Sequence, residues 1–550
     1  MPRLYLPTVK PSFASRDLLV LFLLWAAATA LDFGKAFHMD DTFHLLAAQW
    51  IEHHPLQPMS GLVNWGHDPQ PLHYFNQPPG FFYLIALTGH FFGYGEGVMH
   101  GLRALFSLLA ITNMYLLARH FAKDQALFIT ALLTLCPAFL VNQGLMTDVP
   151  LLAMQLLGFR LLLVPCAGSK RRHYLLAALA FSAAAFIKYT TLPVLVVFPL
   201  VLFLRKERRY ALFALVPIVL LALWSLWNLQ EFGSAHLFGR PGGDHSALAI
   251  LKRLLGILAA IGAVIPVVAA FAMGKFPTMR KWVWASWLSM LLAFAAMALL
   301  VYTGQLGEAV SDEVLRVIFT SNGTLFVALA FLAVPRKIWR VAPDRMALVL
   351  WAGGLAAFLA LFAPMMATRH ILLVLAPLLL LLAPMLDAAG AKARGLALAS
   401  TAALGVLLTV SDKEYAGFYR DMAPRIAHDM GDEHTVWSAG HWGWQWYAAQ
   451  AGMRTYAQHG EQPVAGDVIV LPEEYDAQSI APSVQVVPMR TYDTPPSLGT
   501  FFNVEQFAGM YTSSFGKLPW SLSRSHLKVI QVYRVVDHGG APLVQDPFGK

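Results

Sequence analysis

The sequence predicts a mostly α-helical, polytopic membrane protein that carries a small α/β domain at its C-terminal end. Of its 550 residues, 57% are hydrophobic and only 13% are charged, whereas a soluble protein has about 25% charged residues. Apolar runs close to the length of a membrane span, about 20 residues, recur along most of the chain. After Ser411 charged residues, glycine and proline return, which is typical of a domain outside the membrane.

The first span, residues 17–33, follows a basic N-terminal segment that should stay in the cytoplasm. No A-x-A-like cleavage site is obvious, so we expect an uncleaved anchor rather than a signal peptide. Residues 38–96 then form the first extracytoplasmic loop. Apolar residues at helical spacing predict an interfacial helix over residues 40–52, and the short apolar run after Pro79 predicts a second interfacial or re-entrant helix.

Twelve further spans bring the expected total to about thirteen transmembrane helices. The two spans beside Lys188 are the shortest. We expect these spans at about 97–119, 124–142, 148–166, 174–188, 190–204, 210–231, 251–273, 282–303, 317–334, 346–366, 371–386 and 396–411.

Basic clusters between the spans support this count, because lysine and arginine gather in cytoplasmic loops. The first loop, the turn before Asp148, residues 232–250 and everything after 412 are then extracytoplasmic, and Lys252-Arg253 is the one basic pair on the wrong side. The clusters on the cytoplasmic side are Arg119/Lys123, Lys170-Arg171-Arg172, Arg205-Lys206-Arg208-Arg209, Lys275/Arg280/Lys281, Arg336-Lys337-Arg340 and Lys392/Arg394.

We therefore divide the chain into a transmembrane domain, residues 1–412, and a C-terminal extracytoplasmic domain, residues 413–550. In the latter, TVWSAG, DVIVLP, VQVVP and KVIQVYRVV are predicted strands, with helices at about 415–429 and 443–451. We find no internal repeat of the kind seen in many transporters and no phosphate-binding P-loop. The net charge of +8 comes from short clusters between apolar runs, which argues against nucleic-acid binding.

Three acidic residues lie where spans meet the outer surface: Asp40 and Asp41 follow span one, and Asp148 begins span four. Each carboxylate could simply begin a helix, where free N–H groups and the helix dipole favour negative charge. Alternatively, one is a general base that faces a lipid-delivered substrate. Several acids together could also position an acceptor or hold a divalent metal. No other cofactor is implied.

Two basic residues stand out on the same side. Lys188 lies between two short apolar runs, where a lysine is costly unless it snorkels outward or meets an anion. Arg369-His370 forms a tight turn before a leucine-rich span, and arginine suits bidentate contact with phosphate. Both are candidate phosphate ligands.

Other outer residues allow two interpretations. The first-loop histidines, among them His73, fit no standard zinc spacing, and interfacial histidines without metal are the simpler explanation. The aromatic run GHWGWQWY at 440–447 could stack on a sugar ring, but aromatic residues are also common at a membrane interface.

Taken in order, these motifs resemble those of the membrane-embedded C-class glycosyltransferases, in particular the bacterial branch of the dolichyl-phosphate-mannose–protein mannosyltransferase and aminoarabinose-transferase superfamily. An acidic pair follows span one, a proline pair opens the next apolar run, and an acid, a lysine and an arginine turn come later. The motifs are MDDTFHLLAAQWI, NQPPGFFYLIAL, MTDVPLL, AAFIKYTTLPV and TRHILLVLAPLLLLL, followed by GHWGWQWY.

The resemblance implies roles for individual residues. Asp40 matches the catalytic carboxylate, with Asp41 beside it, and Asp148 matches a second acid near the acceptor. Lys188 and Arg369 fall where relatives hold the donor phosphate. Gln77 stands where some members have a lysine before the prolines, Gly80 replaces the usual leucine, and His370 the commoner tyrosine. The candidates for acceptor or sugar contact are His73, Tyr74, His370 and Trp442.

The activity that the resemblance implies is transfer of a monosaccharide from a polyprenyl phosphate to a lipid, glycan or protein on the outer face of the inner membrane. Two alternatives stay open. A lipid-sugar flippase would bind the same ligand without reacting, although transporters usually bind at the bilayer midplane. A whole-glycan transferase would use a diphosphate-linked oligosaccharide instead.

Overall fold

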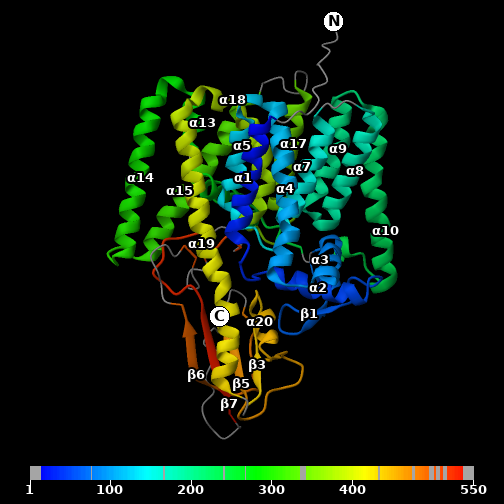
Figure 1. The fold of residues 1–550 in the computed structure, drawn as a ribbon, viewed down its shortest axis with the longest axis vertical. Coiled ribbons are helices and arrows are strands. Elements are labelled where there is room, and N and C mark those ends of the chain that lie inside the picture. Colours follow the sequence, from blue (N-terminus) through cyan, green and yellow to red (C-terminus); the bar gives the residue numbers. More distant parts are fainter. Residues whose placement is uncertain are drawn as a thin grey trace.

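The computed structural model describes residues 14–75, 77–164, 168–239, 242–266, 268–334, 342–431, 434–473, 477–494, 501–502, 508–511 and 517–536. Most of these residues are helical, and a small sheet lies at one end of the helix bundle (Figure 1). The predicted fold class, a polytopic membrane protein with a small C-terminal α/β domain, is confirmed.

Eight described helices are long and apolar enough by themselves to cross a membrane. The remaining predicted spans are shorter or less apolar helices that pack among these eight. The helices of the bundle are α1 (Ser15–Asp32), α4 (Glu96–Phe121), α5 (Ala126–Leu135), α7 (Asp148–Leu163), α8 (Lys170–Ile187), α9 (Leu192–Leu204), α10 (Leu215–Phe232), α12 (Ala247–Val264), α14 (Arg280–Tyr302), α15 (Glu308–Leu332), α17 (Pro343–Leu361), α18 (Ile371–Ala389) and α19 (Ala391–Met430).

Three predicted spans differ from the helices. Span 124–142 is divided between α5 and α6 (Pro137–Leu140), with Cys136 in an extended conformation before the proline, because a residue before proline disfavours the helical region. Span 251–273 is likewise divided between α12 and α13 (Ala269–Lys275). Span 396–411 is too short: α19 continues as one helix to Met430, well into the C-terminal domain (Figure 1).

The helix ends with predicted cytoplasmic clusters lie together at one end of the bundle. Arg205 at the end of α9 pairs with Asp344 at the start of α17 at 3.0 Å, and His120 at the end of α4 contacts the same carboxylate at 3.1 Å. Of the pair Lys252-Arg253, predicted on the wrong side, Lys252 is exposed, whereas Arg253 is buried and donates a 2.8 Å hydrogen bond to the carbonyl of Ala363. It therefore acts inside the protein and gives no topology signal. The cluster at 336–340 lies outside the described residues.

The first loop folds against the opposite end of the bundle. It contains α2 (Asp41–His53), a hairpin of β1 (Leu62–Asn64) and β2 (Pro69–Pro71), and α3 (Gly80–Phe92). Both helices predicted in this loop are therefore present. Figure 1 shows α2 and β1 at the end of the bundle where the sheet also lies.

Within the described residues, the C-terminal sheet has five strands in the order β4-β3-β5-β7-β6. The first three run parallel, whereas β7 is antiparallel to both of its neighbours. The helix α20 (Trp444–Gln450) follows β3, as predicted. The strands are β3 (Val436–Ser438), β4 (Arg454–Thr455), β5 (Val468–Pro472), β6 (Val486–Asp493) and β7 (Val529–Val535).

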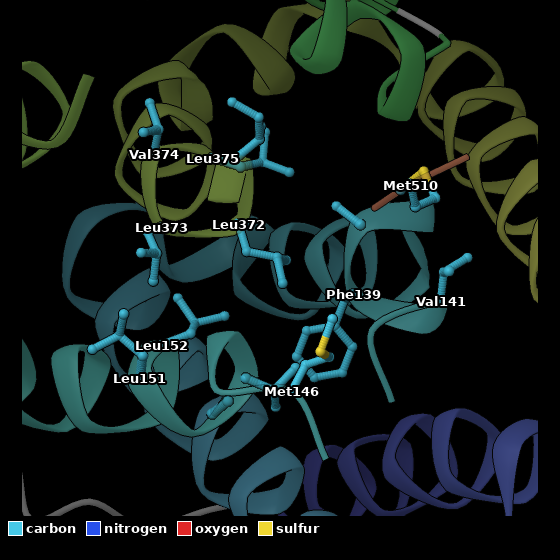
Figure 2. Packing of buried hydrophobic residues seen from close by; sticks show 14 of the residues in the cluster. Phe139, Val141, Met146, Leu151, Leu152, Leu372, Leu373, Val374, Leu375 and Met510 are labelled. Atoms are coloured by element: carbon cyan, nitrogen blue, oxygen red, sulfur yellow. The ribbon is translucent and has the colours of Figure 1, made fainter. Parts of the chain in front are cut away.

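The core of the bundle surrounds α18, whose most apolar stretch is 83% buried, against 11% for α14 at the edge. Figure 2 shows Leu372 and Leu373 of α18 in the same packed layer as Leu151 and Leu152 of α7. Met510, from the C-terminal domain, also belongs to this core. The helix that begins at Asp148 and the helix that follows Arg369 are thus held by dense apolar packing.

Candidate active site

Four of the predicted site residues meet at the end of the bundle beside the first loop. Asp40 is the last residue before α2, Asp148 is the first residue of α7, and Lys188 lies between α8 and α9. Arg369 is in a 3-10 turn, Thr368–His370, that leads into α18. Each lies at a helix terminus, so its side chain lies at the end of the bundle and not in the apolar packing between the helices.

These four side chains form one network of ion pairs. Arg369 contacts both acids, with Nη2 3.0 Å from Asp40 Oδ2 and Nε 3.3 Å from Asp148 Oδ2. Lys188 Nζ donates to Asp148 Oδ1 at 2.9 Å. The side chains are mostly buried, with exposed fractions of 16% for Asp40, 13% for Lys188, 7% for Arg369 and 1% for Asp148. Two carboxylates and two cations therefore balance in charge.

The simpler interpretation of the two acids, helix capping, finds no support in the side-chain hydrogen bonds. Asp40 occupies the capping position of α2, yet its side chain makes no capping hydrogen bond. Asp148 lies inside the first turn of α7, and each of its carboxylate oxygens pairs with a cation. The ion pairs, rather than the helix ends, determine where these carboxylates lie.

Local backbone breaks place the two cations. Helix α8 ends at Ile187, and Lys188 adopts an extended conformation before the next short turn. At the arginine turn, His370 accepts a 3.2 Å hydrogen bond from the Ala367 N–H through Nδ1. The histidine thus stabilises the turn that carries Arg369.

Asp41 lies next to Asp40 in sequence but outside the network of ion pairs. Its Oδ2 accepts a 3.1 Å hydrogen bond from the His38 N–H, and its Oδ1 is buried without a hydrogen-bond partner among the described residues. Burial raises the pKa of Asp41 to about 7, although the positive charge of Lys35 lowers it. The two adjacent acids therefore have different environments, and only Asp40 meets the arginine.

Gly144 is what leaves room for Asp41. A Cβ at this glycine would lie 2.7 Å from Asp41 Oδ2, whereas a Cβ at Gly353 in α17 would meet nothing within 4 Å. We expect Gly144→Ala to lower the free energy of unfolding by about 1–3 kcal/mol, the usual cost of overpacking. Gly353→Ala should not destabilise the protein. Thermal unfolding of the two variants in detergent checks this, and equal stabilities would contradict the contact.

Gln77 borders the network through His44, one of the first-loop histidines considered above as metal ligands. His44 in α2 contacts Gln77 Oε1 through Nε2 at 3.1 Å and the Leu145 carbonyl through Nδ1 at 2.8 Å. Leu145 precedes Asp148 by three residues. His44 therefore connects the proline-pair segment to the start of α7.

Three predicted contact residues lie apart from the ion pairs. His73 stacks on Phe232 at 4.1 Å between ring centres and contacts the Ser234 carbonyl at 3.2 Å. Tyr74 is 60% exposed. The ring of Trp442 lies 5.0 Å from that of Trp65. The structure does not bring these three side chains to Arg369.

A second group of buried charges was not identified from the sequence. Lys35 forms an ion pair with Asp412 and donates to the hydroxyl of Tyr511 at 3.1 Å and to the Val141 carbonyl at 3.0 Å. The Tyr511 ring faces Arg369, with the guanidinium carbon 5.9 Å from its centre. The available signal was the position of Lys35 and Asp412 just outside apolar runs, where charges normally mark loop ends.

The described residues contain no group of three or more His, Cys, Asp or Glu side chains that could hold a metal ion. What the four-residue network offers is a pair of cations that could bind an anion, with a carboxylate directly beside them. Such a pair can stabilise negative charge that develops on a departing phosphate.

Residues 76–229 match the family model described as dolichyl-phosphate-mannose-protein mannosyltransferase. The matched region contains Gln77, Asp148 and Lys188, and the match confirms the resemblance that the order of the motifs predicted. No curated protein matches the sequence.

The chain aligns with several solved structures. The oligosaccharyltransferase of Archaeoglobus fulgidus is 16% identical with a TM-score of 0.49, over 80% of this chain and 62% of that chain. ArnT from Cupriavidus metallidurans is 16% identical with a TM-score of 0.40, over 83% and 92%. The mycobacterial arabinofuranosyltransferase AftD is 14% identical with a TM-score of 0.42, over 96% and 40%. The chain thus spans less than two thirds of the archaeal enzyme.

Proposed function

We propose that this member of the dolichyl-phosphate-mannose–protein mannosyltransferase superfamily transfers a hexose or pentose from a polyprenyl-phosphate donor to a hydroxyl group. The acceptor is a lipid, glycan or protein, and the reaction takes place on the outer face of the inner membrane. The N-terminus is then cytoplasmic, and residues 413–550 form an extracytoplasmic domain on a transmembrane domain of residues 1–412. The basic clusters between the spans support this orientation.

The observation that carries the proposal is that Arg369 contacts Asp40 directly, at 3.0 Å, while Lys188 joins the same network through Asp148. A phosphate held by the two cations would lie within a few ångströms of the Asp40 carboxylate. A base and a site for the leaving group are thus adjacent, which is the arrangement that a direct displacement requires.

In the proposed reaction Asp40 takes the proton of the acceptor hydroxyl as its oxygen attacks the anomeric carbon. The bond from that carbon to the phosphate oxygen breaks, and the phosphate keeps the electron pair. Arg369 and Lys188 stabilise the added charge. Asp148, buried and ion-paired with both cations, holds them in position. Gln77, through His44, lines the same edge of the site.

We assign acceptor or sugar contact to His370, Trp442, His73 and Tyr74. His370 is next to Arg369, and the buried indole N–H of Trp442 has no hydrogen-bond partner in the part of the chain that the structure describes. His73 and the exposed Tyr74 belong to the first loop at the same end of the bundle, where an acceptor would approach.

One displacement predicts inversion at the anomeric carbon. The test uses purified protein in proteoliposomes with undecaprenyl-phosphate mannose and undecaprenyl-phosphate arabinose, together with lipid and peptide hydroxyl acceptors. The anomeric configuration of the product is read by NMR. Retention of configuration would exclude a single displacement by this site. Net movement of the donor across the vesicle membrane without any product would instead support a flippase.

A further inference from the structure

The backbone that leads into Asp40 adopts an unusual conformation. Met39 has φ of 52°, in the left-handed region, which is unfavourable for a residue with a side chain. Strained backbone of this kind persists only where surrounding contacts hold it, and it gathers at functional sites. Since Asp40 follows directly and α2 begins at Asp41, the conformation of Met39 sets the course of the backbone into Asp40.

The contacts that hold this backbone come from the GHWGWQWY motif at 440–447. The Trp442 carbonyl accepts a 3.1 Å hydrogen bond from the Met39 N–H, and Trp442 is itself left-handed, with φ of 53°. The Tyr447 hydroxyl accepts from the Phe37 N–H at 2.7 Å and donates to Glu96 Oε1 at 2.6 Å. The 440–447 motif of the C-terminal domain thus binds two backbone N–H groups, those of Phe37 and Met39, in the segment before Asp40.

Gly443 brings the two backbones into contact. Its φ is +109°, and a Cβ on it would lie 2.9 Å from the Phe37 carbonyl oxygen and 3.3 Å from His38 Cα. The close approach explains why a glycine stands between two tryptophans at this point.

Tyr511, also from the C-terminal domain, holds the other side of the segment. Its hydroxyl bonds to Lys35 at 3.1 Å and to Asp412 at 3.2 Å. Its ring packs edge-on against His38 at 5.2 Å and faces Arg369. The domain therefore touches both the segment that presents Asp40 and the arginine that meets it.

We propose that the 440–447 motif is a positioning element for Asp40, with Gly443, Tyr447 and the Trp442 carbonyl as positioning groups. The inference rests on the proposed function, because it concerns the base of that reaction. The motif acts chiefly through its backbone and one hydroxyl. A misplacement of about 1 Å in a reacting group can cost about a hundredfold in rate. Weakening the contacts of the motif with this segment therefore lowers kcat and leaves the affinity for phosphate unchanged.

The first test compares two glycines of the same domain. Gly443→Ala adds a methyl group against Phe37, whereas Gly466→Ala adds one at a similar φ of +95° with nothing within 4 Å. We expect kcat for sugar transfer to fall at least about tenfold in Gly443→Ala, with the Kd for undecaprenyl phosphate within about twofold of the parent. Gly466→Ala should keep the parent kcat. Equal kcat values in the two variants overturn the proposal.

The second test needs no sugar substrate. Tyr447→Phe removes the hydroxyl between Phe37 and Glu96, and Tyr492→Phe removes a matched hydroxyl that donates to Asp429 at 2.7 Å elsewhere in the domain. Hydrogen exchange of the peptide covering residues 35–41 should accelerate at least about tenfold in Tyr447→Phe. In Tyr492→Phe it should not change. Unchanged exchange in both variants overturns the proposal.

The two tests separate this inference from the proposed function. If the parent protein transfers no sugar from any donor tested, the proposed function fails, and the exchange experiment still decides whether the motif holds the segment before Asp40. If transfer occurs and exchange accelerates in Tyr447→Phe while the kcat of Gly443→Ala stays at the parent value, the motif is only structural and the inference fails.

Discussion

Asp40→Asn is expected to reduce sugar transfer by about 10²–10⁴-fold, the usual contribution of a general base. Asparagine has nearly the same shape, and its carbonyl oxygen can still accept from Arg369, which now lies 3.0 Å from Asp40 Oδ2. The fold and the phosphate contacts should therefore survive. The initial transfer rate is measured in proteoliposomes, alongside the Kd for undecaprenyl phosphate. This Kd should not increase, because Arg369 loses a competing anion.

The matched control for this variant is Asp68→Asn in the same first loop. Asp68 accepts hydrogen bonds from the backbone N–H and the ring of His459, at 2.8 and 2.7 Å, away from the ion pairs. Its variant should keep transfer within about twofold, as expected for a change outside the site. Transfer by Asp40→Asn above about a tenth of the parent rate, or an equal loss in Asp68→Asn, would remove Asp40 from the role of base.

The residues of the ion-pair network could be predicted because charged residues are rare within the apolar sequence of a membrane protein. Asp148, Lys188 and Arg369 each interrupt or border an apolar run, where an ionisable residue is costly and therefore informative. Their order along the chain then suggested one site, and the contacts of Arg369 with both acids agree with that expectation. Only the resemblance separated Asp40 from Asp41, because the residue types are the same: Arg369 contacts Asp40, whereas Asp41 fits into the space beside Gly144.

Other features depend on information that residue types do not carry. Lys35 and Asp412 lie at opposite ends of the transmembrane domain in sequence, and each looks like an ordinary flank of a span, yet they form a buried ion pair. The GHWGWQWY motif attracted attention through its tryptophans, but its contacts with Phe37 and Met39 run through a carbonyl, a glycine and one hydroxyl. The length of α19 was missed because hydropathy marks the apolar part of a helix and not its end.

Replacing Arg369 by glutamine is expected to remove donor binding and to destabilise the protein. Glutamine leaves Asp40 without a cation and Asp148 with Lys188 alone. Loss of one partner from a buried ion pair typically costs about 3–5 kcal/mol, and loss of a group that stabilises a departing anion costs about 10²–10³-fold in rate. Thermal unfolding and transfer rate measure the two effects.

Arg369→Lys separates charge from geometry. Lysine restores the positive charge, so most of the lost stability should return. The ammonium has one donor nitrogen and cannot present two separate nitrogens to the two carboxylates, as the planar guanidinium does through Nη2 and Nε, so transfer should stay at least about tenfold below the parent. Arg454→Gln, which breaks an exposed pair with Glu461 at 2.8 Å, is the control and should change stability by less than about 1 kcal/mol. Parent-level transfer in Arg369→Lys would mean that any cation suffices and that the contact with both acids has no part in holding the phosphate.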